Sequence, residues 1–170
     1  GGKVTLGSQA SLFADASGKA VLKALTDKGY DALAVDVGRD AAEQVRKSGI
    51  EIAFNALHGK FGEDGAIQGM LEIMGIPCTG SGILASAMGM NKIISKTLFK
   101  AYGLHVGAFL SVSRGDRDML RTAQAEIGFP LVVKPSSEGS SVGVSLVHAQ
   151  SDFDAAVKLA FRYDPEILVE

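Results

Sequence analysis

The sequence predicts an α/β protein in two parts: an open parallel sheet in residues 1–88 and a partial α+β layer in residues 89–170. Apolar runs bounded by turn residues alternate with longer segments of helical period, which is typical of βα units. After about Met88 the strands follow one another more closely, which indicates a change of architecture. Glycine makes up 21 of the 170 residues, above the usual share of roughly 7%, and it collects where strands are expected to end.

The first part is expected to alternate strands with helices. The predicted elements are, in order, strand 3–6, helix 19–25, strand 32–37, helix 40–47, strand 50–55, helix 67–74 and strand 76–79. In the first helix, Val21, Leu22 and Leu25 share one face and Gly29 marks the end. The run 50–55 has little polarity on either face, so we expect a strand that is covered on both sides.

The second part is expected to begin with one long helix. The predicted elements are, in order, helix 86–102, strand 108–112, helix 116–127, strand 130–134, strand 144–147, helix 152–162 and strand 167–169. Helices are assigned where apolar residues recur every three to four positions, and strands where short apolar runs stand between turn residues. The chain ends inside the last strand, at Glu170, so we expect a longer parent protein.

Composition and charge argue against several kinds of partner. The chain has 17 basic and 19 acidic residues, a net charge of -2, so nothing attracts it generally to nucleic acid or to an anionic membrane. No stretch approaches the roughly 18 apolar residues of a membrane span, and no signal-peptide pattern is present. The single cysteine, Cys78, is expected to be a buried thiol. The sequence therefore predicts a cytoplasmic protein without nucleic-acid or membrane partners.

A loop of small residues follows the predicted strand 130–134. It runs Lys-Pro-Ser-Ser-Glu-Gly-Ser-Ser-Val-Gly from Lys134 to Gly143. Glycine permits the positive φ angles of an anion-binding nest, serine hydroxyls add donors, and the lysine adds a positive charge. The G-x-x-x-x-G-K-[ST] order of a Walker A loop is absent. The pattern favours a phosphate site over the alternative, an ordinary hairpin turn.

A second glycine-rich segment lies between strand 50–55 and helix 67–74. Ligands of open α/β sheets bind beyond the carboxyl ends of strands, where this segment stands. His58 could therefore orient a carboxylate or a neighbouring side chain. Asp64 could instead cap the helix that starts near Ala66. The functional and the structural interpretation both stay open.

Two other segments are less informative by themselves. Thr79-Gly80-Ser81-Gly82 could bind an anion before a helix, but the same residues make a common loop. Lys92 and Lys96 are four residues apart and share one helix face, which by itself is more typical of a solvated surface.

Several separated motifs stand in the order, and at about the spacing, of one known family. They are Asn55-Ala56-Leu57-His58-Gly59, Gly62-Glu63-Asp64-Gly65, Ile67-Gln68-Gly69, Thr79-Gly80-Ser81-Gly82, Met90-Asn91-Lys92, Val133-Lys134-Pro135 and Glu138-Gly139-Ser140-Ser141-Val142-Gly143. From about Ser17 to Glu170, the sequence resembles the D-alanine–D-alanine ligases of the ATP-grasp superfamily.

The resemblance implies a fold and an activity. Residues 1–88 would form the Rossmann-like pre-ATP-grasp domain on the substrate side, and residues 89–170 part of the ATP-grasp central domain. The implied reaction joins two D-alanines through an acyl phosphate, for peptidoglycan synthesis, with ATP and Mg²⁺ as cofactors and a homodimer formed through the N-terminal domain. The metal ligands are expected beyond residue 170, so these residues alone are expected to be inactive. The alternatives are another ATP-grasp ligase, such as a D-alanine:D-lactate enzyme, or a non-catalytic nucleotide-binding fragment.

The resemblance also implies roles for individual residues. The implied cofactor-binding residues are Lys92, Lys134, Glu138, Gly139, Ser140, Ser141 and Glu170, and the implied catalytic residues are Ser140 and His58. The two lysines would reach the ATP phosphates, the loop would cover them, and Glu170 would begin the adenine-binding hinge. His58 would lie near the first D-alanine.

The first loop departs from the family pattern. A glutamate that holds the ammonium group of the first substrate is expected there, but no acidic residue precedes Asp15, and Leu12 stands at the glutamate's position in one register. The substrate anchor therefore has no assignment in this sequence.

Overall fold

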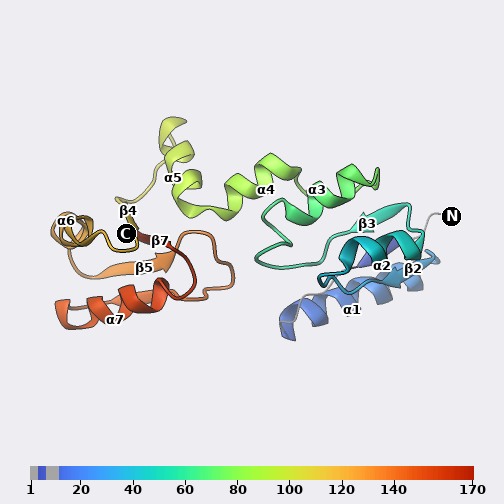
Figure 1. Cartoon of the computed structure of the whole chain (residues 1–170), viewed down its shortest axis with the longest axis horizontal. Coiled ribbons are helices and arrows are strands. Elements are labelled where there is room, and N and C mark those ends of the chain that lie inside the picture. Colours follow the sequence, from blue (N-terminus) through green and yellow to red (C-terminus); the bar gives the residue numbers. More distant parts are fainter. Residues whose placement is uncertain (1–3, 7–11) are drawn as a thin grey trace. The chain divides into compact units, whose positions relative to one another are not determined.

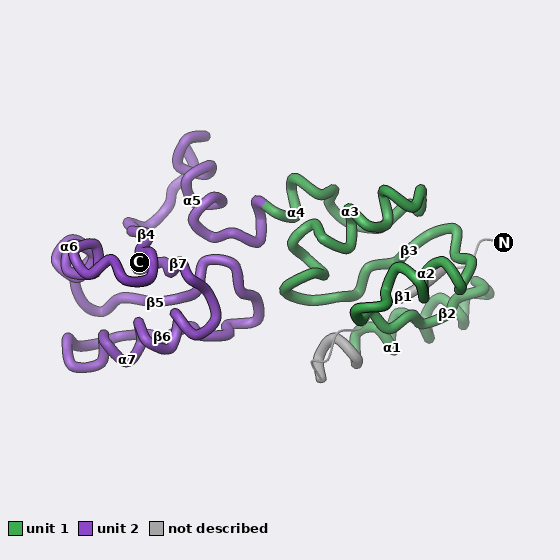
Figure 2. Tube along the Cα trace, viewed as in Figure 1, with its two compact units in different colours: residues 1–87 green, residues 88–170 purple. Residues whose placement is uncertain are grey.

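The structure, a computed structural model, describes residues 4–6 and 12–170, and side chains from residue 16 onward. The chain forms two compact units, Gly1–Ala87 and Met88–Glu170 (Figure 2). The division falls within helix α4 (Ile83–Met90).

A small parallel sheet organises the first unit. Its central strand is β1 (Val4–Leu6), and β2 (Ala32–Ala34) and β3 (Ile52–Phe54) pair with it in parallel on either side. Three helices complete this part before α4: α1 (Leu12–Asp27), α2 (Ala41–Ser48) and α3 (Ala66–Ile73) (Figure 1). Each strand is followed by a helix, as the alternation of patterns in the sequence predicts.

The core of the first unit gathers on one side of β3. Its buried members are Val35, Val45, Ile50, Ala53, Leu57, Ile67 and Leu71. Ile67 and Leu71 are one turn apart on α3, so a single face of that helix enters the core. Ala53 of β3 belongs to this core, so β3 is fixed in place. The segment that follows β3 therefore starts at the carboxyl end of the sheet.

Two expectations for this unit need correction. The run 50–55 is not covered on both sides: Ala53 is buried, whereas Ile52, on the opposite face of the strand, is 43% exposed. Apolar side chains are common on protein surfaces, so an apolar run does not by itself prove two covered faces. The predicted strand 76–79 is only an isolated parallel bridge between Ala53 and Cys78.

The second unit contains a four-stranded antiparallel sheet. Its strand order is β4 (Leu110–Ser113), β7 (Glu166–Val169), β5 (Leu131–Pro135) and β6 (Ser145–Val147). The helices are α5 (Lys92–Ala101), α6 (Arg117–Ile127) and α7 (Gln150–Ala160), and α7 lies beside β5 and β6 (Figure 2).

Side chains alternate along each strand, so the sheet of the second unit has a core face and an opposite face. The core face joins alternate residues of the strands to α6 and α7: Val112, Ala123, Leu131, Val133, Val147, Phe153, Ala156, Val157, Ala160, Ile167 and Val169. Val133 pairs with Val169, and Lys134 pairs with Leu168. Val132 and Glu170 exchange backbone hydrogen bonds of 2.6 and 3.0 Å. Lys134 and Glu170 therefore share the face that turns away from this core.

The predicted helix 86–102 is wrong as a single element. Helix α4 ends at Met90 and α5 begins at Lys92, because Asn91 has the extended angles φ -83° and ψ 107°. The Asn91 side-chain oxygen accepts hydrogen bonds from the amides of Ile93 and Ile94, both at 3.0 Å. An asparagine side chain competes for backbone donors in this way, so it starts a new helix.

Within the residues that the structure describes, no helix combines the length and the apolar character needed to cross a membrane.

Candidate functional site

Three lysines of the second unit surround one end of β5. Lys92 and Lys96 stand one turn apart on α5, and Lys134 stands near the end of β5. The amide of Lys92 donates a 2.8 Å hydrogen bond to the carbonyl oxygen of Ser136, which fixes the start of α5 against the residue that follows β5. The backbone therefore brings together lysines that are about forty residues apart in the sequence.

Glu170 binds two of these lysines. Lys134 donates a hydrogen bond to Oε1 of Glu170, and Lys96 forms an ion pair with Oε2. Burial raises the pKa of Glu170, but the hydrogen bonds from Lys134 and Lys96 outweigh this effect and hold the pKa below its usual value. Glu170 is therefore ionised near neutral pH and offsets part of the positive charge.

Lys92 points at the loop that follows β5. Its ammonium group donates to the carbonyl oxygen of Ser136 at 3.5 Å and to that of Glu138. Burial and the positive charge of Lys134 lower the pKa of Lys92, while the carboxylates of Glu138 and Asp164 act in the opposite direction. A site with two adjacent half-buried ammonium groups is favourable for a multiply charged anion, which would relieve their repulsion.

The loop itself contains three residues with left-handed φ angles, a conformation that anion-binding nests use. Ser140 and Ser141 adopt left-handed φ angles of 50° and 60°, and Gly143 follows at 70°. Such angles are uncommon for residues other than glycine and tend to occur at functional sites. At Gly143 a side chain is also excluded by space, because a Cβ atom would lie 2.7 Å from the ring of Tyr163 and 2.8 Å from that of Pro135. Both serines are exposed.

A buried carboxylate that sequence reasoning missed holds the base of this loop. Asp164 accepts hydrogen bonds from the hydroxyl of Ser136 at 2.9 Å and the amide of Ser137 at 2.8 Å. Its other oxygen accepts from the amide of Glu166 at 3.0 Å. The position of Asp164 just before Pro165 is typical of a turn residue, which is the signal that could have drawn attention to it.

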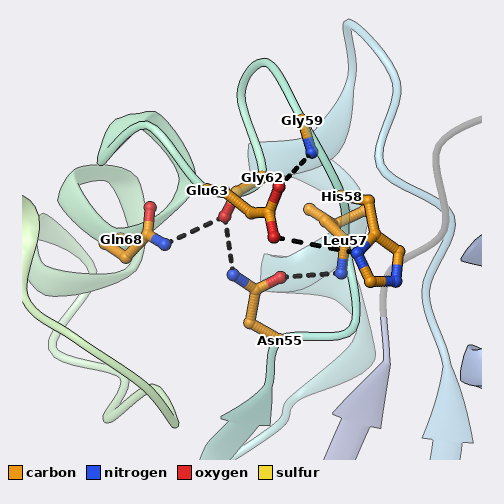
Figure 3. A network of polar contacts seen from close by, with 7 residues as sticks. All are labelled: Asn55, Leu57, His58, Gly59, Gly62, Glu63 and Gln68. Carbon is orange, nitrogen blue, oxygen red and sulfur yellow. Dashed lines mark hydrogen bonds and ion pairs between the residues drawn. The ribbon is translucent and has the colours of Figure 1, made fainter. Parts of the chain in front are cut away.

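The segment after β3 in the first unit is a network of polar contacts (Figure 3). The carbonyl oxygen of Gly62 accepts from the side-chain amides of Asn55 at 2.8 Å and Gln68 at 2.9 Å. Glu63 accepts from the amide of Gly59 at 2.6 Å, and its other oxygen lies 3.7 Å from Nδ1 of His58. His58 is therefore placed beside a carboxylate, and both side chains remain half exposed.

Asp64 has a structural role: its carboxylate binds backbone amides of its own segment. Its carboxylate accepts hydrogen bonds from the amide of Phe61 at 2.8 Å and that of Ala66 at 3.1 Å. The second of these bonds satisfies a free donor at the start of α3 from the position before its N-cap, which is Gly65. Cys78 is half-buried, and burial raises the pKa of its thiol.

The predicted site residues therefore fall in two groups. Lys92, Lys134, Glu170 and the loop residues Glu138, Gly139, Ser140 and Ser141 belong to the second unit, whereas His58 belongs to the first. Lys96 was not among the predicted residues. Its four-residue spacing from Lys92 was the available signal, but it was interpreted as a solvated face.

The described residues include no metal centre. From residue 16 onward, no group of three or more His, Cys, Asp or Glu side chains is arranged to hold an ion. The first loop, where Leu12 stands at the position of the expected glutamate, lies outside the described side chains.

The fold and the site define an α/β protein whose antiparallel sheet carries a cluster of three lysines next to a serine-glycine loop. Two family models match the chain: "D-ala D-ala ligase N-terminus" over residues 36–81 and "D-ala D-ala ligase C-terminus" over residues 98–170. The chain belongs to the D-alanine–D-alanine ligase family.

Curated relatives agree with this assignment. The D-alanine–D-alanine ligase of Geotalea uraniireducens is 58% identical over 154 residues, which are 91% of this chain and 49% of the relative. That of Geobacter sulfurreducens is 54% identical over 155 residues, again 91% of this chain and 48% of the relative. The chain thus spans about half the length of the curated relatives it matches.

Solved structures show the same likeness. The D-alanine–D-alanine ligase from Bacillus anthracis superposes with a TM-score of 0.86 at 30% identity, covering 100% of this chain and 57% of the other. The same enzyme complexed with ATP superposes with a TM-score of 0.83 at 28% identity, covering 100% of this chain and 58% of the other.

Proposed function

We propose that the protein containing this chain is an ATP-dependent D-alanine–D-alanine ligase. The observation that carries this proposal is the pair of half-buried lysines, Lys92 and Lys134, beside the left-handed turn at Ser140 and Ser141, in a chain of this family. The curated relatives named above are D-alanine–D-alanine ligases, and one solved relative is complexed with ATP.

The residues of the second unit fit the phosphates of ATP. Lys92 and Lys134 supply ammonium groups, the loop supplies backbone amides and hydroxyls as further donors, and Ser140 and Ser141 already have left-handed φ angles. When bound, ATP supplies the phosphoryl group that activates the carboxyl of one D-alanine, and the amine of a second D-alanine displaces the phosphate. Lys92 and Lys134 would bind and orient the phosphates, and the segment from Glu138 to Ser141 would shield them from water.

The remaining parts of the proposal rest on the family. Residues 1–88 would be a Rossmann-like substrate-side domain and residues 89–170 part of the ATP-grasp central domain. His58, oriented by Glu63, would lie near the first D-alanine, Ser140 would act in catalysis, and Glu170 would begin the adenine-binding hinge. Mg²⁺ as a cofactor, a homodimer through the N-terminal domain, cytoplasmic location and a role in peptidoglycan synthesis are proposed on the same ground.

Replacement of Lys134 tests the phosphate site. In the full-length protein, Lys134→Ala removes one charge-assisted contact to phosphate, which costs roughly 1.5 to 3 kcal/mol. The affinity for ATP, measured by calorimetry, should therefore fall more than about tenfold, and the affinity for D-alanine should change little. Lys158→Ala, at an exposed position of α7, is the matched control and should leave both affinities unchanged. Equal ATP affinity in wild type and Lys134→Ala would refute the role.

A further inference from the structure

Lys96 has no part in the function proposed so far, yet it is one of the most constrained lysines of the chain. Its side chain is 18% exposed and forms an ion pair with Glu170. Its ammonium group also lies 5.1 Å from the centre of the Phe109 ring, in a cation–π contact. Exposed lysines of this chain make single contacts of either kind, as Lys23 does with Asp27 and Lys60 with Phe61. Lys96 is distinguished by making both contacts while its side chain is largely covered.

The sheet register places Glu170 beside Lys134, and the low exposure of Glu170 makes its pairing important. Lys134 on β5 and Glu170, the residue directly after β7, stand diagonally on the same face, and their side chains meet. The Glu170 side chain is 21% exposed. A carboxylate in such a place is costly if it loses its cationic partner, because water replaces the lost interaction only in part.

Phosphate binding would draw Lys134 away from Glu170, because the two anions compete for the same ammonium group. If Lys134 turns its ammonium group towards phosphate, as the proposed function demands, its bond to Oε1 of Glu170 is weakened or broken. Lys96 holds the other oxygen, Oε2, and approaches from α5 rather than from the strand that carries Lys134. It can therefore remain on Glu170 while Lys134 changes partner.

We propose that Lys96 is a positioning residue of the nucleotide site, which keeps Glu170 paired when Lys134 is transferred to phosphate. The inference rests on the proposed function, since it assumes that phosphate binds Lys134. Lys96 itself need not touch the nucleotide. Its effect is to lower the free-energy cost of separating Lys134 from Glu170.

Binding measurements on the full-length protein test this role. Lys96→Gln should lower the affinity for ATP by about tenfold, the effect of leaving a partly buried charge unpaired, whereas the affinity for adenosine, which has no phosphate, should change little. Lys96→Arg retains the charge and should restore most of the affinity. Lys100→Gln, one turn further along α5 and exposed, is the matched control and should behave as wild type. Wild-type ATP affinity in Lys96→Gln would overturn the proposal.

A double-variant cycle separates this role from a general structural one. In a Glu170→Gln background there is no charge to keep paired, so adding Lys96→Gln should cost little further ATP affinity. An equal loss in both backgrounds would also overturn the proposal, because the effect would then not pass through Glu170.

A measurement without nucleotide distinguishes failure of this inference from failure of the proposed function. NMR titration of the Glu170 carboxyl should show a higher pKa in Lys96→Gln than in wild type, and no change in Lys100→Gln. If wild type binds no ATP, the proposed function fails, and this titration still tests whether Lys96 pairs with Glu170. An unchanged Glu170 pKa in Lys96→Gln would refute the pairing, whatever the protein binds.

Discussion

At the scale of single residues, two carboxylates arrange the cationic site. Glu170 sits between Lys134 and Lys96, and Asp164 anchors the first residues of the loop. The two carboxylates differ in exposure: Asp164 is buried, while Glu170 is only partly covered. Asp164 is therefore expected to act mainly on stability, and Glu170 mainly on the charge available for a ligand.

Asp164→Ala should destabilise the protein strongly. The substitution leaves the buried hydroxyl of Ser136 and the partly buried amides of Ser137 and Glu166 without their acceptor. An unpaired buried donor costs about 1 to 3 kcal/mol, and the two partly buried amides can regain some hydrogen bonding from water, so a total loss of roughly 3 kcal/mol in the free energy of unfolding is expected. Urea denaturation measures it. Asp154→Ala, at an exposed position of α7, should stay within about 0.5 kcal/mol of wild type; similar values for the two variants would contradict the anchoring role.

At the scale of elements, the start of α5 determines where two of the lysines stand. Asn91 ends the preceding helix and caps α5, and the side-chain amide of Asn91 donates to the hydroxyl of Ser137 at 3.3 Å. Lys92 and Lys96 follow one and five residues later. The cap therefore sets both the direction of α5 and its position against the loop.

Asn91→Ala should weaken α5 and loosen its contact with the loop. Loss of an N-cap costs about 1 kcal/mol, and the hydrogen bond to Ser137 is lost as well. Asn91→Ser keeps a capping oxygen without reaching Ser137, so its stability should lie between those of Asn91→Ala and wild type in urea denaturation. If the serine variant were no more stable than the alanine variant, capping would not be the function of this side chain.

At the scale of the whole molecule, the chain has two separate cores. One contains Leu71 and belongs to residues 1–87, and the other contains Leu131 and belongs to residues 88–170. They share no residue. Each unit therefore has its own source of hydrophobic stability.

Leucine-to-alanine substitutions, one in each core, should each destabilise only their own unit. Leu131 and Leu71 are 1% and 3% exposed, and replacing a buried leucine by alanine costs about 2 to 5 kcal/mol. Leu131→Ala should accelerate hydrogen exchange in the strands of residues 88–170, and Leu71→Ala in those of residues 32–54, as measured by mass spectrometry. Equal acceleration in both units by either variant would show one cooperative unit in place of two.

Much of the architecture could be predicted from the sequence because it depends on neighbours along the chain. Apolar periodicity predicts most helices and strands, and the short polar side chain of Asp64 before a helix is compatible with the bond that it accepts from the amide of Ala66. The same local logic missed the break at Asn91, since an asparagine between two helical patterns is compatible with one helix or two. It also overstated the coverage of β3, because exposure depends on what packs against a face.

By itself, the sequence determined the alternation of elements, the glycine-serine loop and the motifs that identify the family. Only the tertiary structure decided which charges meet: Glu170 reaches Lys134 across a separation of 36 residues, and Asp164 reaches Ser136 across 28. The reason is physical. A strand register and a helix direction are set by the packing of the whole core, and a side chain acquires its partners only once both are in place.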